Sequence, residues 1–303
     1  MSVDAYEELR PRAFAIAYRM LGSVSEAEDV VQEAFLRLYR AEQEGERIES
    51  PRAYLSTVVT RLAIDYLRSA RAQRETYVGE WLPEPVLASG EDDPAQQAEM
   101  ADSLSLAFLV LLETLSPEQR AVFLLREVFD YPYDRIAEIV GKSEPNVRQL
   151  AVRARRHVDE GRTRFDASRE QRDALADRFF AAVEEGDLNE LEELLAEDVE
   201  LHGDGGGKAP ALARALFGRS RVARTLRNWL RAMPRMGGVT LRRVDVNGQP
   251  GALLLDREGR VFSVMALDIA DGQVQGIRGI VNPDKLGHLG EVADIGKLLR
   301  GGG

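Results

Sequence analysis

The sequence predicts a multidomain protein with two all-α domains, the second containing a helix-turn-helix, followed by an α+β domain. Three observations favour this fold class. Apolar residues recur at helical spacing through most of residues 4–164, and short strand-like runs replace this pattern beyond residue 170. Between the two helical blocks, residues 76–97 contain Gly and Pro without periodicity. At 303 residues, the chain is long enough for two or three domains.

The first domain, residues 1–75, is expected to contain three helices. A capping box at Ser25 and Glu28 predicts the start of the second helix, and Ser50 followed by Pro51 predicts the start of the third. Both helices have an apolar face that we expect to be buried. These faces comprise Val30, Val31, Ala34, Phe35 and Leu38 in the second helix, and Leu55, Val58, Leu62 and Tyr66 in the third.

Residues 76–100 are predicted to form a flexible linker, and residues 101–164 the second helical domain. Ser116 is expected to cap a helix of that domain. Further on, Gly141 separates a short helix from a longer one capped by Ser143. A short helix, a glycine turn and a second helix are typical of a helix-turn-helix.

Residues 170–290 are expected to form the α+β domain, and residues 291–303 a C-terminal tail. Helical patterns occupy residues 173–185, 188–196 and 220–233, and strand-like runs follow at 239–246, 252–256, 261–269 and 274–281. The turn signals between these runs are Asn247-Gly248, Glu258-Gly259 and Asp271-Gly272. Helices followed by closely spaced strands indicate an α+β domain with an antiparallel meander.

A basic stripe lies on the third helix of an otherwise acidic chain. The net charge of −11 by itself argues against nucleic-acid binding, so the positions of the basic residues matter. Residues three or four apart share one face of a helix. The stripe comprises Arg52, Arg61, Asp65, Arg68 and Arg71. A solvated helix face is the alternative interpretation, and a second basic cluster favours DNA binding.

That second cluster lies on the longer helix of the helix-turn-helix. Its predicted outward side chains are Asn146, Arg148, Gln149, Arg153 and Arg156. Asn and Gln can pair with adenine edges in the major groove, and Arg can bind guanine or phosphate. The alternative is a helical hairpin with a charged surface, but the cap, the turn and the basic face together favour DNA recognition.

Composition excludes several other classes of site. The chain has no Cys, so disulfides, thiolate metal sites and cysteine nucleophiles are absent. The N-terminus lacks an apolar signal core, and we expect a soluble, cytoplasmic protein without a membrane segment. We expect no metal and no cofactor. His202, Asp204 and Asp268 could act as acid or base by residue type, but no paired spacing stands out, so we expect no catalytic residue.

Several segments of the first 160 residues together resemble the sigma-70 superfamily of RNA polymerase subunits in its short extracytoplasmic-function form. They are residues 27–35 (AEDVVQEAF), 51–55 (PRAYL), 61–68 (RLAIDYLR) and 115–123 (LSPEQRAVF). The resemblance implies that the first domain is sigma domain 2 and the second is sigma domain 4. It also implies two partners, which are promoter DNA and core RNA polymerase, bound through the beta-prime clamp and the beta flap.

The resemblance assigns roles to the residues that match. Asp29, Gln32 and Phe35 would bind the polymerase clamp, with Phe35 as an exposed aromatic anchor. The alternative for Phe35 is a place in the core, with the apolar face of its helix. The stripe on the third helix would hold the opened minus-ten element, whose splayed bases and single strand need basic contacts. The basic helix of the helix-turn-helix would bind the minus-thirty-five element as duplex DNA.

The remainder of the chain resembles the subgroup of these sigma factors that carries a SnoaL-like C-terminal domain. Residues 77–85 (YVGEWLPEP), Asp204-Gly205-Gly206-Gly207-Lys208 and Asn282-Pro283-Asp284-Lys285-Leu286 carry this resemblance. It implies a cone-shaped fold in which a curved sheet and helices enclose a pocket. It also implies regulation in cis, in which the last two motifs contact the sigma domains and no separate anti-sigma factor is needed.

Two other functions remain open at this point. One is a DNA-binding transcription regulator whose C-terminal domain senses a ligand. The other is a SnoaL-type cyclase or isomerase fused to a DNA-binding head. Neither the promoter sequence, the inducing signal, nor the ligand of the pocket follows from the sequence.

Overall fold

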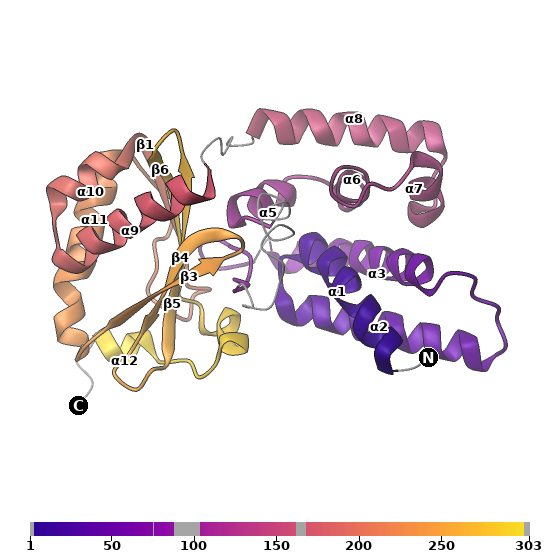
Figure 1. Cartoon of the computed structure of the whole chain (residues 1–303), viewed down its shortest axis with the longest axis horizontal. Helices are drawn as coiled ribbons and strands as arrows, with labels where there is room; N and C mark the ends of the chain where they lie inside the picture. The colour runs from indigo at the N-terminus through magenta and orange to yellow at the C-terminus, as the bar shows by residue number, and fades with distance from the viewer. Residues whose placement is uncertain (1–2, 75, 88–103, 162–167, 300–303) are drawn as a thin grey trace. The chain divides into compact units, whose positions relative to one another are not determined.

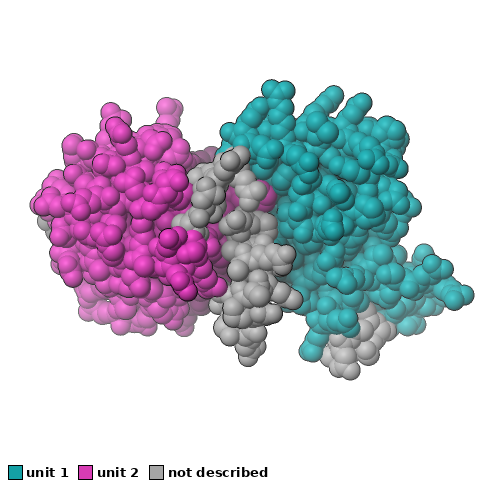
Figure 2. Space-filling view, turned by 45° about the horizontal axis from the view of Figure 1, so that its top comes forward, with its two compact units in different colours: residues 1–76, 109–162 teal, residues 77–108, 163–303 magenta. Residues whose placement is uncertain are grey.

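The computed structural model describes residues 3–74, 76–87, 104–161 and 168–299. The chain divides into two compact units (Figure 2). Unit 1 comprises residues 1–76 and 109–162, and unit 2 comprises residues 77–108 and 163–303. Both predicted helical domains therefore lie in unit 1, except that residues 101–108 and 163–164 of the second are assigned to unit 2. The first part of the predicted linker belongs to unit 2, for reasons given with the site below.

The first helical domain of unit 1 consists of three long helices that pack on one another (Figure 1). They are α1 (Val3–Leu21), α2 (Val24–Gln43) and α3 (Pro51–Arg74). The predicted start of α3 is confirmed, because the Ser50 hydroxyl accepts a hydrogen bond from the Ala53 amide at 3.3 Å. No helix among the described residues is both long enough and apolar enough to cross a membrane.

Two local predictions in this domain are wrong. Ser23, not Ser25, caps α2 and accepts from the Glu26 amide at 3.3 Å. The buried face of α3 includes Val59 and Ala63, and Val58, Leu62 and Tyr66 are only half-buried. The buried face also contains two hydroxyl residues, Ser56 and Thr60, which donate to the carbonyls of the helix itself. Their polarity hid the true face from the apolar pattern.

The second helical domain forms around a small core in the same unit. Its elements are α5 (Leu106–Glu113), α6 (Pro117–Phe123), the π-helical turn η1 (Leu124–Val128), α7 (Tyr133–Val140) and α8 (Glu144–Gly161). Ser116 and Gln119 form a capping box at the start of α6, so the predicted cap is confirmed. Gly141 ends α7 with a positive φ of 66°, which suits glycine, and α8 follows as the second helix of the helix-turn-helix.

Unit 2 contains a six-stranded sheet with helices packed on one face (Figure 1). Its helices are α9 (Arg169–Glu185), α10 (Leu188–Leu194), α11 (Arg219–Ala232) and α12 (Ile295–Leu299), with short 3-10 turns η2 (Met233–Met236), η3 (Pro283–Lys285) and η4 (Gly287–Leu289). The strands are β1 (Leu195–Asp204), β2 (Leu216–Phe217), β3 (Thr240–Val246), β4 (Gln249–Leu255), β5 (Val261–Ala270) and β6 (Gln273–Ile280). Their order is β2-β1-β6-β5-β4-β3. The predicted fold class is therefore confirmed.

The predicted meander forms, but the sheet also contains strand β1, which the sequence analysis did not predict. Because β1 is parallel to its neighbour, the sheet is mixed. Strands β3 to β6 are antiparallel, and the turns at Asn247-Gly248 and Asp271-Gly272 have the predicted positive φ angles. Strand β1 pairs with β6 in parallel, with a register shift between Leu195 and Glu200. That bulge and the glycines that follow break the alternation expected of a strand.

Candidate functional site

The exposed face of α2 contains two of the three predicted polymerase-binding residues. Asp29 and Gln32 are exposed. Phe35 is only 6% exposed, and its ring lies 4.5 Å from that of Tyr6, so the expectation of an exposed anchor at this position is wrong. Phe35 lies on the apolar face that packs into the domain, as its spacing from Val31 and Leu38 already indicates.

Two apolar residues that the sequence analysis missed lie on the exposed face instead. Leu36 is 43% exposed and Tyr39 is 52% exposed. Together with Asp29 and Gln32 they follow a spacing of three, four and three residues, which keeps all four on one face of the helix. We call these four residues the α2 face. The sequence could have indicated this face, because Leu36 and Tyr39 continue the helical spacing that begins with Asp29 and Gln32.

The basic stripe on α3 is exposed at Arg52, Arg61, Asp65 and Arg68. Arg71 belongs to α3, but its side chain lies outside the described residues. Within unit 1, α3 packs against α6 and α7 of the second helical domain. The stripe therefore shares its surroundings with the domain that contains the helix-turn-helix.

Arg61 binds the carboxyl end of the first helix of the helix-turn-helix. Its Nε donates to the carbonyl of Ile139 at 2.9 Å, and its Nη2 donates to the carbonyl of Glu138 at 2.8 Å. The last carbonyls of a helix have no partner within the helix and carry the negative end of its dipole. A guanidinium that would otherwise be available to phosphate is thus held by α7.

Arg68 makes a second contact of the same kind. Its guanidinium lies 2.5 Å from the Glu118 carboxylate of α6 and 3.2 Å from that of Asp65 on its own helix. Burial raises the pKa of Glu118, but the hydrogen bond to Arg68, a backbone hydrogen bond and the nearby positive charges together leave that pKa lowered. Nearby, the Tyr131 hydroxyl donates to the Ser56 hydroxyl at 2.8 Å.

A buried arginine connects α6 to α1 in the same interface. Arg120 is 1% exposed, donates from Nε to the carbonyl of Arg19 at 3.1 Å, and pairs with Glu113. Burial lowers the pKa of Arg120 to about 9 and that of Arg19 to about 10. Burying a charged group costs free energy, so access to solvent would stabilise the charged forms of both guanidinium groups.

On α8, all five predicted DNA-binding residues are exposed. They are Asn146, Arg148, Gln149, Arg153 and Arg156. Arg148 pairs with Glu144 at 2.5 Å and lies 4.5 Å from the centre of the Tyr133 ring, and Arg156 pairs with Glu160 at 2.8 Å. Exposed pairs within one helix are weak, so these cations can exchange to phosphate or base edges.

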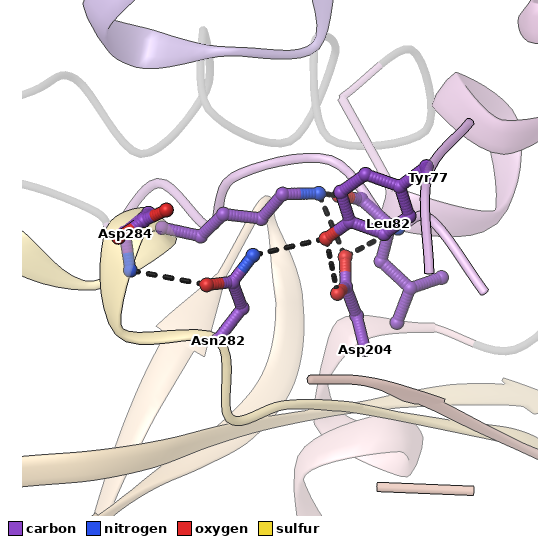
Figure 3. Close-up of polar contacts among 6 residues, drawn as sticks. Tyr77, Leu82, Asp204, Asn282 and Asp284 are labelled. Carbon is purple, nitrogen blue, oxygen red and sulfur yellow. Dashed lines mark hydrogen bonds and ion pairs between the residues drawn. The ribbon is translucent and has the colours of Figure 1, made fainter. Parts of the chain in front are cut away.

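In unit 2, Asp204 is the centre of a buried polar cluster (Figure 3). It lies at the end of β1 and is 0% exposed. Its carboxylate accepts from the Tyr77 hydroxyl at 2.5 Å and from the Leu82 amide at 2.8 Å. Burial, with Asp204 as the second cause, raises the pKa of Tyr77, so the phenol stays protonated and donates.

Lys285 supplies the positive charge of this cluster. Its Nζ lies 2.7 Å from the Asp204 carboxylate and also donates to the carbonyl of Leu82. The same ammonium lies 4.3 Å from the centre of the Trp81 ring and 5.0 Å from that of Tyr77, which adds cation–π attraction. The sequence motifs around Asp204 and Lys285 therefore meet on residues 77–82.

The remaining motif residues shape the cluster. Asn282 donates to the Tyr77 hydroxyl at 2.9 Å and accepts from the Asp284 amide at 3.1 Å (Figure 3). Gly206 has a positive φ of 58°, and a Cβ there would lie 2.2 Å from the Asn282 amide nitrogen. Only glycine fits this turn. Other members are Gly205 and Gly207 in the same turn, Pro283 at the start of η3, Leu286, which is fully buried, and Lys208, which forms an exposed pair with Asp284.

Residues 77–87 are held by unit 2 along their length, which corrects the expectation of a flexible linker. The Val86 amide and carbonyl bond to Asn247, and the Pro85 carbonyl lies 2.7 Å from a ring nitrogen of His288. Leu82 is 0% exposed. The prolines that suggested a spacer leave an extended chain whose remaining polar groups bond to this domain. The rest of the predicted linker lies largely outside the described residues.

The acid and base candidates of unit 2 are already engaged. Asp268 forms a buried ion pair with Arg278. The two ring nitrogens of His202 contact Glu80 at 2.5 Å and Glu200 at 2.8 Å. Burial lowers the pKa of His202, but these hydrogen bonds outweigh burial and leave that pKa raised. Among the described residues, no group of three or more His, Asp or Glu could hold a metal ion.

Comparisons with known families follow the same division of the chain. Residues 5–73 match the model of sigma-70 region 2, residues 105–158 match that of sigma-70 region 4, and residues 176–281 match that of the SnoaL-like domain. Each match corresponds to one of the three domains described above.

Relatives and a solved structure match nearly the whole chain. The extracytoplasmic-function RNA polymerase sigma factor SigJ of Mycobacterium tuberculosis is 39% identical over 295 residues, covering 94% of this chain and 93% of the relative. The probable sigma factor SigI of the same organism is 35% identical, covering 90% and 91%. The crystal structure of M. tuberculosis SigJ matches with a TM-score of 0.75 at 37% identity, covering 94% of this chain and 98% of that chain. This chain therefore belongs to the extracytoplasmic-function family of RNA polymerase sigma factors, in the form with a C-terminal SnoaL-like domain.

Proposed function

We propose that this protein directs core RNA polymerase to promoters, with three surfaces of unit 1 in separate roles. The α2 face binds the polymerase beta-prime clamp, the α3 stripe holds the opened minus-ten element, and α8 binds the minus-thirty-five element in the major groove. The beta flap is the partner of the second helical domain. These partners belong to the bacterial cytoplasm. The chemistry of the exposed side chains supports each role.

The contact of Arg61 and Arg68 with the second helical domain is the observation that carries the regulatory part of the proposal. Both cations are needed on promoter DNA, and both are engaged with α7 or α6. The two helical domains must therefore separate before the α3 stripe can hold a single strand. Opening also gives the buried Arg120 access to water.

We infer that unit 2 regulates this opening in cis through residues 77–87. These residues follow α3 directly in the sequence, and unit 2 holds them through Asp204, Lys285 and Asn247. These contacts fix residues 77–87, which are part of the segment that joins the two helical domains. They therefore determine how far that segment can extend when the domains separate. A separate anti-sigma factor is not needed for such a mechanism.

Run-off transcription with purified core polymerase tests the proposal. Four chains are compared: wild type, a chain ending at Arg169, Lys285→Gln, and Lys297→Gln, which changes an exposed lysine of unit 2 outside both motifs, as the control. We expect the truncation and Lys285→Gln to change transcript yield in the same direction, and Lys297→Gln to leave it unchanged. Equal yield from all four chains would remove the regulatory claim, whereas no yield from any of them would remove the sigma-factor role.

A further inference from the structure

Helix α11 of unit 2 is a third basic helix, which the sequence analysis did not single out. Its 14 residues, Arg219–Ala232, include five Arg and no Asp or Glu. The chain as a whole has a net charge of −11, so this helix differs sharply from the rest. Like charges three or four residues apart on a helix are neighbours and repel one another. A partner of opposite charge would relieve this repulsion.

The apolar face of α11 is buried inside unit 2. Val222 and Ala223 are 0% exposed and Leu226 is 3% exposed, and all three belong to the core of this unit. The helix packs on β1, α9 and α10 (Figure 1). This packing determines which residues point outward, because the period of a helix places residues three and four apart on one face.

Opposite the apolar face lies a row of exposed polar side chains, which we call the α11 face. It comprises Arg221, Arg224, Asn228 and Arg231, which follow a spacing of three, four and three residues and are all exposed. A helix rises about 1.5 Å per residue, so the row is about 15 Å long. The three guanidinium groups and the amide can all donate hydrogen bonds.

The three arginines of the α11 face have no partner for their guanidinium groups among the residues that the structure describes. Glu184 and Glu185 of α9 line a groove together with Arg231, but neither pairs with it, and Glu184 contacts Arg243 at 3.7 Å. Arg178 of α9 shows the usual arrangement of an exposed arginine in this unit, since it pairs with Glu190 at 2.6 Å. The donors of the α11 face are therefore available to an external anion.

The length and composition of the row fit the phosphates of duplex DNA. Arg and Asn are among the side chains that contact the DNA backbone. One strand of a duplex carries a phosphate about every 3.4 Å along its axis, so a row of about 15 Å can face about four of them. Contacts to phosphate carry no sequence information, so binding of this kind is independent of sequence.

Two other anionic partners fit the face less well. A helix that lies on a membrane needs an apolar face that can enter the lipid, and that of α11 is buried in the core. A protein interface needs a desolvated apolar or aromatic centre. Trp229 is the one exposed large apolar residue of α11, and it lies outside the row and lines a cavity inside unit 2.

We propose that the α11 face binds the phosphate backbone of duplex DNA, independently of sequence. Unit 2 then contributes to DNA binding directly, in addition to the regulatory role proposed above, and this contribution does not depend on that role. The face is exposed in the structure as it stands, so binding requires neither polymerase nor separation of the helical domains.

Fluorescence anisotropy of the full chain with a labelled duplex that contains no promoter sequence tests the proposal. The variant combines Arg221→Gln, Arg224→Gln and Arg231→Gln, and Gln has nearly the helix propensity of Arg. We expect the affinity to fall at least about tenfold at about 0.1 M salt. The slope of log affinity against log salt concentration should shrink by about two to three, because each lost phosphate contact removes about 0.9.

A matched control changes three exposed arginines of unit 2 that already have acidic partners. It combines Arg169→Gln, Arg178→Gln and Arg243→Gln, and alters the net charge equally. Because salt screens distant charges, the control should lose less than about threefold in affinity and keep its slope. Lys in place of all three arginines of the face keeps the charges and should also keep the slope.

Absence of duplex binding by the wild type, an equal loss in the control, or a Lys variant that loses as much slope as the Gln variant would each overturn the proposal. A Gln variant that binds DNA like wild type would overturn it too. If that variant then lost affinity for core polymerase or for vesicles with phosphatidylglycerol, the face would belong to an acidic protein or to a membrane. If the Gln variant does not fold, Arg224→Gln alone should reduce the slope by about one, and an unchanged slope would overturn the proposal.

Discussion

The α3 stripe in unit 1 and the Asp204 cluster in unit 2 both hold cations against another part of the chain, but they differ in burial. In the stripe, the Arg68 side chain is 56% exposed and its partner Glu118 is 22% exposed. In the cluster, Lys285 is 8% exposed and Asp204 is 0% exposed. An exposed pair contributes at most about 1 kcal/mol, whereas breaking a buried pair costs about 3–5 kcal/mol. The stripe is therefore exchangeable with DNA, and the cluster is persistent.

Removing the positive charge of Lys285 from the Asp204 cluster should have the largest effect among the variants that test this difference. Lys285→Gln leaves the Asp204 carboxylate buried without its ion partner, so we expect unit 2 to lose about 3–5 kcal/mol of unfolding free energy. Chemical denaturation measures it. The matched change Lys208→Gln breaks an exposed pair with Asp284 and should cost less than about 1 kcal/mol. Equal losses from both variants would contradict the comparison.

The α2 face extends the comparison to the surface that we propose binds core polymerase. Replacing Leu36 and Tyr39 together with Ser should weaken binding to core polymerase at least about tenfold, because exposed apolar side chains of this kind anchor interfaces. Surface plasmon resonance with immobilised core polymerase measures the affinity. Arg40→Ser, an exposed change beside the face, is the control. A double variant that binds like wild type would assign polymerase docking elsewhere.

A smaller effect should follow from freeing Arg68. Glu118→Gln removes its acidic partner on α6 and leaves Arg68 itself intact, so promoter affinity of the holoenzyme should rise by up to about fivefold. Fluorescence anisotropy with labelled promoter DNA measures this change, and Glu33→Gln, which breaks the exposed pair with Arg37, is the control. In an Arg68→Ala background the gain should vanish. A gain that persists there would show that Glu118 acts by another route.

We expect the smallest effect for the pH dependence of stability that His202 contributes. Its folded pKa is raised above the ordinary 6.5, so the protonated ring stabilises unit 2 fully below that pH, and this stability is lost as pH rises through the folded pKa. The melting temperatures of wild type and His202→Gln, followed from about pH 5 to 8, should therefore converge as pH rises. A constant difference would mean that the contacts with Glu80 and Glu200 do not depend on protonation.

Local signals in the sequence predicted most of the fold. The caps at Ser50 and Ser116, the glycine at Gly141 and the hairpin turns lie where the pattern places them, because each depends on a few neighbouring residues. Strand β1 was missed because its partner β6 lies far along the chain and its own pattern contains a bulge. The buried face of α3 was misplaced because hydroxyls that bond to their own helix lie within it.

The candidate site divides in the same way. Residue type and spacing alone placed the basic residues of α8 on its surface, since outward positions of a helix follow from its period. The same reasoning did not separate Phe35 from Leu36 and Tyr39, although their spacing carried the information. Nothing local indicates that Arg61 binds the end of α7, because the partners are 77 and 78 residues apart.

By itself, the sequence determined the order of domains, most of their secondary structure and the presence of two basic helices in an acidic chain. Only the tertiary structure decided which cations are engaged, and that residues 77–87 belong to unit 2. The physical reason is the distance along the chain between the residues that determine each feature. Helix period, caps and turns are encoded within a few residues, whereas burial and ion pairing depend on which distant segments meet when the chain folds.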